Sequence, residues 1–192
     1  MSNDLLSSLK NKHTGESCLI FACGPSLRDF FSDNSQNDIE SFMKKNTVFS
    51  IKQSYLQLRG CSDYHFFNCN NFMPYKKNNN IFVAQDDGIR KDMLSNFWGN
   101  QEYDILVNLN PATNFLVDSS NIDEYMFDTN PRRPRGPGIM YETVLYFAVH
   151  LGFKSIQTVG WDYMPPNVEN VTGHFYPEKL RKKLKNPAAL RS

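Results

Sequence analysis

Short apolar runs recur along the chain, and polar or turn-forming residues separate them. The run over 17–23 is bounded by Gly15 and Gly24 and contains no charged residue. This pattern is typical of a strand buried on both faces of a parallel sheet. Similar runs predict further strands over 47–51, 63–68, 80–84, 104–108 and 154–159.

Between these runs, the spacing of the apolar residues becomes helical. The clearest helix is predicted over 138–151, where packing side chains recur every fourth residue and Gly152 supplies a C-terminal stop. The polar segment 110–138 is rich in Pro, Asn and Asp, and it predicts a long loop. Shorter helices are predicted over 4–11, 26–31, 36–45 and 88–97.

Strands that alternate with helices indicate βαβ units and therefore an α/β protein. We predict a single Rossmann-like domain over 1–164, in which helices flank a mostly parallel central sheet. Residues 165–192 would form a small C-terminal lid or a truncated tail. The length of 192 residues suits one such domain.

Composition and charge narrow the possible partners. The chain is 40% hydrophobic and 21% charged, which indicates a globular protein and excludes a disordered one. A formal net charge of +1 provides no overall attraction to nucleic acid. Attraction to phosphate would have to come from local basic clusters, such as those at 132–135 and 179–185.

The four cysteines suggest a reducing compartment. Cys18, Cys23, Cys61 and Cys69 form neither a CxxC pair nor a zinc-binding pattern, so we expect free thiols and no metal site. The N-terminal residues lack the basic and apolar regions of a signal peptide, and the apolar runs are too short to span a bilayer. We expect a cytoplasmic protein, and peripheral association with the inner face of the membrane stays open.

The first candidate site is the turn Gly24–Pro25–Ser26, which follows the first predicted strand and opens into a helix that Ser26 could cap. Backbone N–H groups at such a turn can point at an anion, and the helix dipole adds to the attraction. Gly24 would let a ligand approach closely. A plain strand-to-helix turn explains the same residues equally well.

A second candidate precedes the clearest helix. Arg135, Gly136, Pro137 and Gly138 form a loop that feeds a helix N-terminus. An arginine beside it is suited to bidentate phosphate contacts. The alternative is a solvated basic loop.

Two further candidates lie near the end of the last predicted strand. Asp162 follows that strand, where it could bind a sugar or ribose hydroxyl or cap the next segment. His174 lies in a polar loop and could act as a general base, although a lone histidine is more often a surface residue. The remaining histidines are weaker candidates: His13 is one of them, His65 alternates with core positions, and His150 lies near a helix end.

Taken in order, these motifs resemble a known family. The order is strand–GPSL, a strand ending in Lys52–Gln53, a strand ending in Asn68, Gly-x-Gly before a helix, Gly-x-Asp-Tyr, and Gly-His. It resembles the bacterial sialyltransferases of the Campylobacter lipooligosaccharide type and, more loosely, flagellin glycosyltransferases and pterin diphosphokinase-like proteins. The similarity covers about residues 17–176.

This resemblance implies an inverting, metal-independent transfer from a CMP-activated sugar, with no essential cofactor besides the donor. His174 would take the proton from the acceptor hydroxyl. The family's tyrosine at the leaving phosphate aligns with Met164, so Tyr163 and Tyr176 are candidates to replace it. The donor site would consist of Cys23, Gly24, Pro25, Ser26, Lys52, Gln53, Asn68, Arg135, Gly136, Pro137, Gly138 and Asp162.

Some residues depart from the family pattern. Cys23 and Lys52 stand where the family has asparagine, and Gly136–Pro137 replaces Thr-Ser. Because Lys52 and Arg135 add positive charge, a donor with more phosphate, such as phosphoribosyl diphosphate, is an alternative to a CMP-sugar.

We therefore expect a glycosyltransferase that builds a bacterial surface polysaccharide or lipooligosaccharide. Its partners would be the activated donor and the glycan acceptor, with no nucleic acid, and we expect a homo-oligomer. Two alternatives remain. One is a diphosphokinase-like enzyme that uses ATP and magnesium. The other is a non-catalytic donor-binding domain of a larger glycan-assembly protein.

Overall fold

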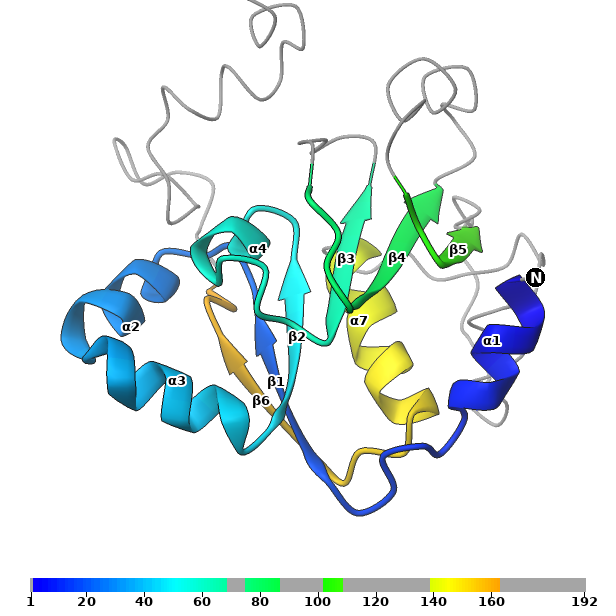
Figure 1. The fold of residues 1–192 in the computed structure, drawn as a ribbon, viewed down its shortest axis with the longest axis horizontal. Coiled ribbons are helices and arrows are strands. Elements are labelled where there is room, and N and C mark those ends of the chain that lie inside the picture. Colours follow the sequence, from blue (N-terminus) through cyan, green and yellow to red (C-terminus); the bar gives the residue numbers. More distant parts are fainter. Residues whose placement is uncertain (1, 69–74, 87–101, 109–138, 163–192) are drawn as a thin grey trace, which may run out of the picture.

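A computed structural model describes residues 2–68, 75–86, 102–108 and 139–162. Its centre is a six-stranded sheet of order β5-β4-β3-β2-β1-β6 (Figure 1). Every pairing between neighbouring strands is parallel, which confirms the predicted α/β class with its parallel sheet. The strands are β1 Ser17–Phe21, β2 Thr47–Ile51, β3 Tyr64–Asn68, β4 Ile81–Asp86, β5 Ile105–Asn108 and β6 Ser155–Val159.

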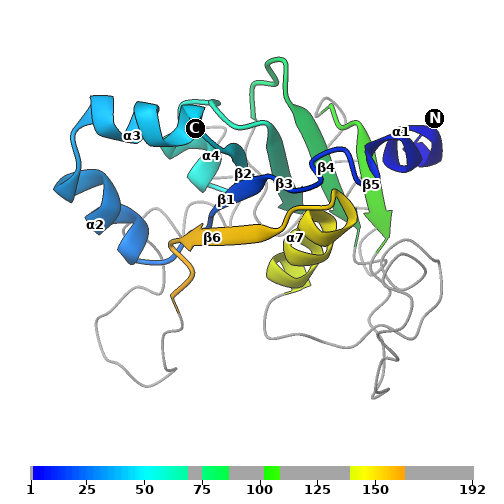
Figure 2. The ribbon, with the colours of Figure 1, turned by 90° about the horizontal axis from the view of Figure 1, so that it is seen from below.

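Helices cover both faces of this sheet, as the Rossmann-like prediction requires (Figure 2). One face packs against α7 and α1, and the other packs against α2, α3 and α4. The described helices are α1 Ser2–Leu9, α2 Ser26–Asp33, α3 Gln36–Lys44, α4 Ser54–Gln57 and α7 Ile139–His150.

Strand β1 shows why its sequence is apolar at every position. Leu19 and Phe21 pack in the cluster on the α2 and α3 side, whereas Cys18 and Ile20 pack in the cluster that contains Phe147 of α7. All four side chains are 0% exposed. A strand with a core on each face cannot alternate apolar and polar residues.

Most predicted boundaries agree with the structure to within a few residues, and β2 has the predicted bounds. The four-residue helix α4 was not predicted. The capping prediction for α2 was wrong: Pro25 is the N-cap residue, and no side chain caps the helix from that position. The Ser26 hydroxyl instead accepts a hydrogen bond from the Gly160 N–H, at 3.2 Å. The predicted helix 88–97, loop 110–138 and lid 165–192 lie outside the described residues.

The strand order creates a switch point between β1 and β6. Strands β2 to β5 follow one another outward on one side of β1, and β6 then pairs on its other side. In open α/β sheets, ligands bind outside the carboxyl ends of the strands at such a point. The turn after β1 and the segment after β6 meet there, so the fold places two of the predicted stretches where a ligand is expected.

None of the described helices is long and apolar enough to cross a membrane.

Candidate functional site

The carboxyl ends of β1, β2 and β6 bring together predicted residues from three parts of the sequence. The Gly24 N–H donates to the Gly160 oxygen at 2.7 Å, and the Cys23 thiol donates to the Ile51 oxygen at 3.1 Å. Asn68 ends β3 at the same edge of the sheet, where its backbone is in register with Gln85 of β4. The sequence motifs therefore converge as parallel topology requires.

Gly24 is a glycine because the segment after β6 passes close to it. A Cβ atom there would lie 2.6 Å from the Gly160 oxygen and would also overlap Asp162 Oδ2. Distances of this kind are not found in real structures, so a side chain would push the two segments apart. The prediction was that Gly24 makes room for a ligand; the structure shows that it makes room for the protein's own backbone.

The N–H groups of this turn already have acceptors within the protein. Ser26 donates its N–H to Asp162 Oδ2 at 2.8 Å. The next two amides bond to the Gly24 and Pro25 oxygens, and Pro25 itself has no N–H. The predicted set of free donors is therefore absent from this turn. A carboxylate of the chain, Asp162, holds the position expected for a ligand anion.

Asp162 therefore has a definite structural role. The sequence leaves two roles open for it, a hydroxyl-binding residue or a cap for the segment that follows it. In the structure its carboxylate bonds to the first turn of α2, more than a hundred residues earlier. Negative charge is favourable there because it complements the helix dipole. Asp162 is exposed to solvent, and its second carboxylate oxygen, Oδ1, accepts no hydrogen bond from the described residues.

Lys52 adopts an unusual backbone conformation directly after β2. Its φ is +54°, in the left-handed region that non-glycine residues rarely adopt, and its N–H donates to the Phe66 oxygen at 2.7 Å. Such a conformation costs on the order of 1 kcal/mol, and strain of this kind concentrates at functional sites.

The side chain of Lys52 is also unusual. Burial lowers the pKa of its ammonium group, while the nearby Cys23 acts in the opposite direction. Burial raises the pKa of the Cys23 thiol to about 11, so this thiol is neutral near pH 7 and cannot balance the lysine charge. No ion pair joins Lys52 to a carboxylate of the described residues.

Gln53 follows Lys52 and is almost fully enclosed. It is 2% exposed, and its Oε1 lies 3.8 Å from the Cys23 sulfur, as a second and more distant acceptor for the thiol that donates to the Ile51 oxygen. Its Nε2 has no hydrogen-bond partner in the part of the chain that the structure describes. An unsatisfied buried donor costs about 1–3 kcal/mol. The end of β2 therefore carries a half-buried lysine without an ion-pair partner and an amide donor without an acceptor among the described residues.

Sequence reasoning missed Tyr141 and Ser54. The pKa of Tyr141 is raised to about 12, mainly by burial and also by the nearby Cys23 and Asp162, while a hydrogen bond from the Cys23 backbone N–H acts in the opposite direction. The ring of Tyr141 packs edge-on against Trp161, with centroids 4.4 Å apart. The Ser54 hydroxyl ties two strand ends together, accepting from the Ile51 N–H at 2.9 Å and donating to the Phe21 oxygen at 2.7 Å. The only signal for Tyr141 was its place in the first turn of the clearest helix.

His65 and His150 make contacts that stabilise the fold. His65 is 0% exposed, hydrogen bonds through Nδ1 to Ser50 Oγ at 2.9 Å, and has ring contacts with Tyr55 and Phe67. Desolvation lowers its pKa to about 3, so the ring is neutral near pH 7. The sequence predicted only that His65 alternates with core positions in a strand; the structure shows that its own side chain is buried in the core as well. His150 lies in the last turn of α7, as predicted, and donates from Nε2 to the Leu6 oxygen at 3.0 Å.

Several predicted site residues lie outside the described residues. These are the catalytic candidates His174, Tyr163 and Tyr176 and the loop residues Arg135, Gly136, Pro137 and Gly138. The helix α7 begins at Ile139. The predicted roles of all seven residues stay predictions.

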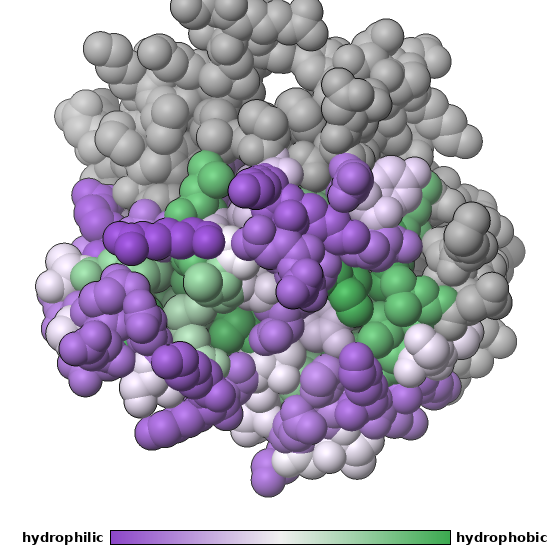
Figure 3. Space-filling model, viewed as in Figure 1, coloured by the Kyte–Doolittle hydropathy of each residue, from purple (hydrophilic) through white to green (hydrophobic). Residues whose placement is uncertain are grey.

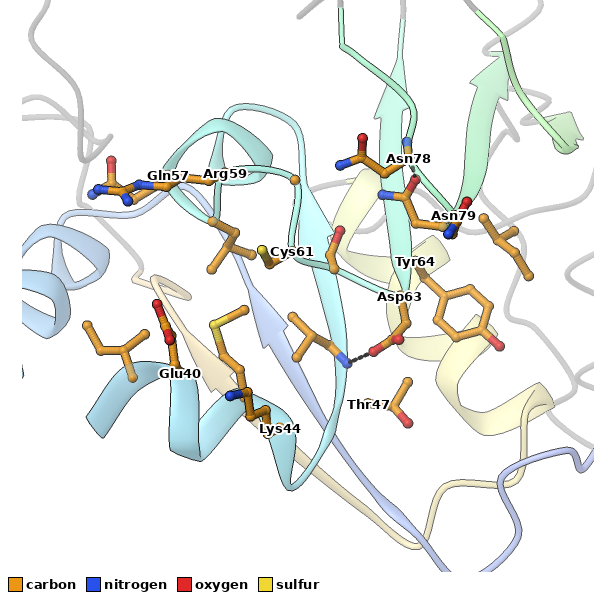
Figure 4. A pocket seen from close by; sticks show the side chains of 18 of the residues that line it. Glu40, Lys44, Thr47, Gln57, Arg59, Cys61, Asp63, Tyr64, Asn78 and Asn79 are labelled. Carbon is orange, nitrogen blue, oxygen red and sulfur yellow. Dashed lines mark hydrogen bonds between the residues drawn. The ribbon is translucent and has the colours of Figure 1, made fainter. Parts of the chain in front are cut away.

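A separate groove of about 790 Å³ lies at the amino ends of β2, β3 and β4. Figure 4 shows Glu40 and Lys44 of α3 on one side of it, Gln57 and Arg59 on another, and Asn78 and Asn79 beyond β3. Figure 3 shows hydrophilic side chains over most of this face, with apolar patches between them. None of the predicted donor-site residues lines this groove. It lies at the edge of the sheet opposite to the predicted site.

The described cysteines Cys18, Cys23 and Cys61 are free, as predicted. Among the described residues, no group of three or more His, Cys, Asp or Glu side chains is arranged to hold a metal ion. A scan against models of protein families found no match, and a search of curated protein sequences also found none.

Proposed function

We propose that this protein is a glycosyltransferase that moves a sugar from a phosphate-activated donor to a bacterial surface glycan. The donor binds at the carboxyl ends of β1, β2 and β6. The observation that carries this proposal concerns the two residues that follow β2. There the half-buried Lys52, with its φ of +54°, and the unsatisfied amide of Gln53 are adjacent in the chain, and Lys52 has no acidic partner among the described residues.

These groups favour an anionic, oxygen-rich ligand. A partly desolvated ammonium group is stabilised by an opposite charge, and a phosphate oxygen is an acceptor suited both to an ammonium group and to an amide N–H. Ligand phosphate would therefore offset a cost that the free protein bears. The position also agrees with the general location of ligands in open parallel sheets.

The proposed chemistry follows the sequence resemblance. His174 takes the proton of the acceptor hydroxyl, whose oxygen forms a bond to the anomeric carbon of the sugar. The bond from that carbon to the donor phosphate oxygen breaks, and the phosphate leaves with the electron pair. Lys52 stabilises the charge on the departing group, and Tyr163 or Tyr176 contacts it.

The test compares Lys52→Met with Lys44→Met, a matched change at an exposed lysine on α3. Donor binding is measured by isothermal titration with a CMP-sugar, a nucleoside-diphosphate sugar and phosphoribosyl diphosphate. We expect Lys52→Met to weaken binding of the preferred donor at least about tenfold, which corresponds to about 1.4 kcal/mol. The control should bind like the wild type.

The same donors are then offered with glycan acceptors. We expect His174→Ala to bind donor normally but to lose turnover about 100-fold or more, as removal of a general base does. Equal donor binding by Lys52→Met and the wild type would contradict the proposed site. Unchanged turnover in His174→Ala would contradict the proposed base.

A further inference from the structure

Three observations around α2 do not fit a turn that binds the donor phosphate itself. The described N–H groups of Gly24 and of the first turn of α2 all bond to protein acceptors. The acceptor at Ser26 is a charged carboxylate, Asp162 Oδ2, at 2.8 Å. A buried donor without a partner among the described residues, Gln53 Nε2, lies instead at the end of β2, in a residue that contacts Cys23.

The geometry points to Asp162 as a built-in anion that excludes the donor phosphate from the Gly24–Pro25–Ser26 turn and leaves Lys52 to bind it. This inference rests on the proposed function, because it takes the ligand to carry phosphate. It makes Asp162 a specificity-determining residue, not a ligand for sugar hydroxyls. It also assigns the turn a structural role and places the anion-binding role at the end of β2.

The physical reason is competition for one position. A carboxylate that accepts a backbone N–H at a helix N-terminus benefits both from a charge-assisted hydrogen bond and from the helix dipole. A phosphate would have to displace it or approach it closely. Two negative groups at that distance repel each other, and each also loses hydration.

The segments around Asp162 are also closely packed. Gly24 has no room even for a Cβ atom, and Gly160, with φ +72°, would place one 2.7 Å from the Ala22 oxygen. The Gly160 N–H also bonds to the Ser26 hydroxyl at 3.2 Å. The turn therefore donates a hydrogen bond to the segment after β6 and accepts another from it. These bonds keep the Asp162 carboxylate at the N-terminus of α2.

A consequence is that the site limits how much negative charge it accepts. One phosphate group can lie at Lys52. A second phosphate that reaches toward α2 meets Asp162. Replacing Asp162 with asparagine keeps the size of the side chain and an oxygen acceptor for Ser26 but removes the charge.

The test is isothermal titration of the full chain with inorganic pyrophosphate at low ionic strength. The variants are Asp162→Asn and, as a matched control, Asp63→Asn. The Asp63 carboxylate also accepts a backbone N–H, that of Val48 at 2.8 Å, but at the amino end of β2 (Figure 4). We expect Asp162→Asn to bind pyrophosphate at least about tenfold more tightly than the wild type, and the difference to shrink in high salt. The control should leave the affinity unchanged.

Unchanged or weaker binding by Asp162→Asn would overturn the inference, and so would a failure of both proteins to bind pyrophosphate. A second measurement uses only the wild type, so it does not depend on how a variant folds. In amide NMR spectra, pyrophosphate should shift the resonance of Lys52 and leave that of Ser26 in place. A shift of Ser26 that saturates with pyrophosphate would show a ligand phosphate at the turn and would refute the inference.

Failure of the proposed function would look different. If Asp162→Asn gains affinity for pyrophosphate but the wild type transfers no sugar from any donor, the role of Asp162 stands and the glycosyltransferase proposal falls. If sugar transfer is found but Asp162→Asn gains no affinity for pyrophosphate, the glycosyltransferase proposal stands and the inferred role of Asp162 falls.

Discussion

The close contact of Gly24 with the segment after β6 allows a quantitative stability prediction. In Gly24→Ala, the added methyl group would lie 2.6 Å from the Gly160 oxygen and 3.0 Å from the Asp162 nitrogen. Both are backbone atoms, so no side-chain rotation relieves the overlap. Overpacking of this kind costs about 1–3 kcal/mol. If the two segments move apart, the hydrogen bonds from Gly24 to Gly160 and from Ser26 to Asp162 weaken as well, at about 1 kcal/mol each.

The expected total is a loss of about 2–5 kcal/mol in the free energy of unfolding. For a domain of this size, each kcal/mol lowers the melting temperature by about 2–4 °C, so a decrease of about 4–20 °C is expected. Urea denaturation followed by circular dichroism gives the free energy, and a thermal scan gives the melting temperature.

Gly15→Ala is the matched control. Gly15 has φ +85°, but a Cβ atom there would have no neighbour within 4 Å. Only backbone strain opposes that change, so a loss of about 1 kcal/mol is expected. The reasoning would be refuted if Gly24→Ala were no less stable than Gly15→Ala, because steric overlap would then contribute nothing.

Two further predictions concern buried titratable groups. The folded pKa of His65, about 3, lies below its usual value near 6.5, so the unfolded chain binds the proton more readily and stability falls as the pH drops through this range. We expect a loss of up to about 1.4 kcal/mol per pH unit, measured by urea denaturation from pH 7 to pH 4, with a shallower dependence in His65→Phe; an identical slope in both proteins would contradict this assignment. Exposed Cys61 should react with a maleimide faster than Cys18 and Cys23, whose burial raises their pKa values to about 12 and about 11. Peptide mass spectrometry after brief labelling checks this order, and modification of Cys18 first would show that its strand opens more readily than the structure implies.

The sequence predicted the sheet well because the strands carry a local signal. In β1 and β2, nearly every side chain is buried, so the apolar run itself marks the strand. The helix α4 was missed because four residues are too few for a helical period to show. The alternation of His65 with apolar neighbours predicted its place in a strand but not the burial of its own side chain.

The candidate site was predicted less completely. Strand ends are visible in a sequence, so Cys23, Lys52 and Asp162 could be chosen as residues at the carboxyl edge. The left-handed conformation of Lys52 has no such signal, because glycine or asparagine is the usual residue with positive φ. Tyr141 was missed because its contact with the backbone of Cys23 depends on how α7 packs against the sheet.

By itself, the sequence determined the elements, their order and therefore a parallel α/β sheet, because burial on both faces imposes an apolar pattern that local residues display. The tertiary structure alone decided what the Gly24–Pro25–Ser26 turn does. From the sequence, its N–H groups were a candidate phosphate site. In the fold, Asp162 comes from the far end of the described chain and takes the Ser26 N–H at 2.8 Å. A hydrogen bond between residues so distant in sequence leaves no local pattern, since it depends on which strands lie side by side in the sheet.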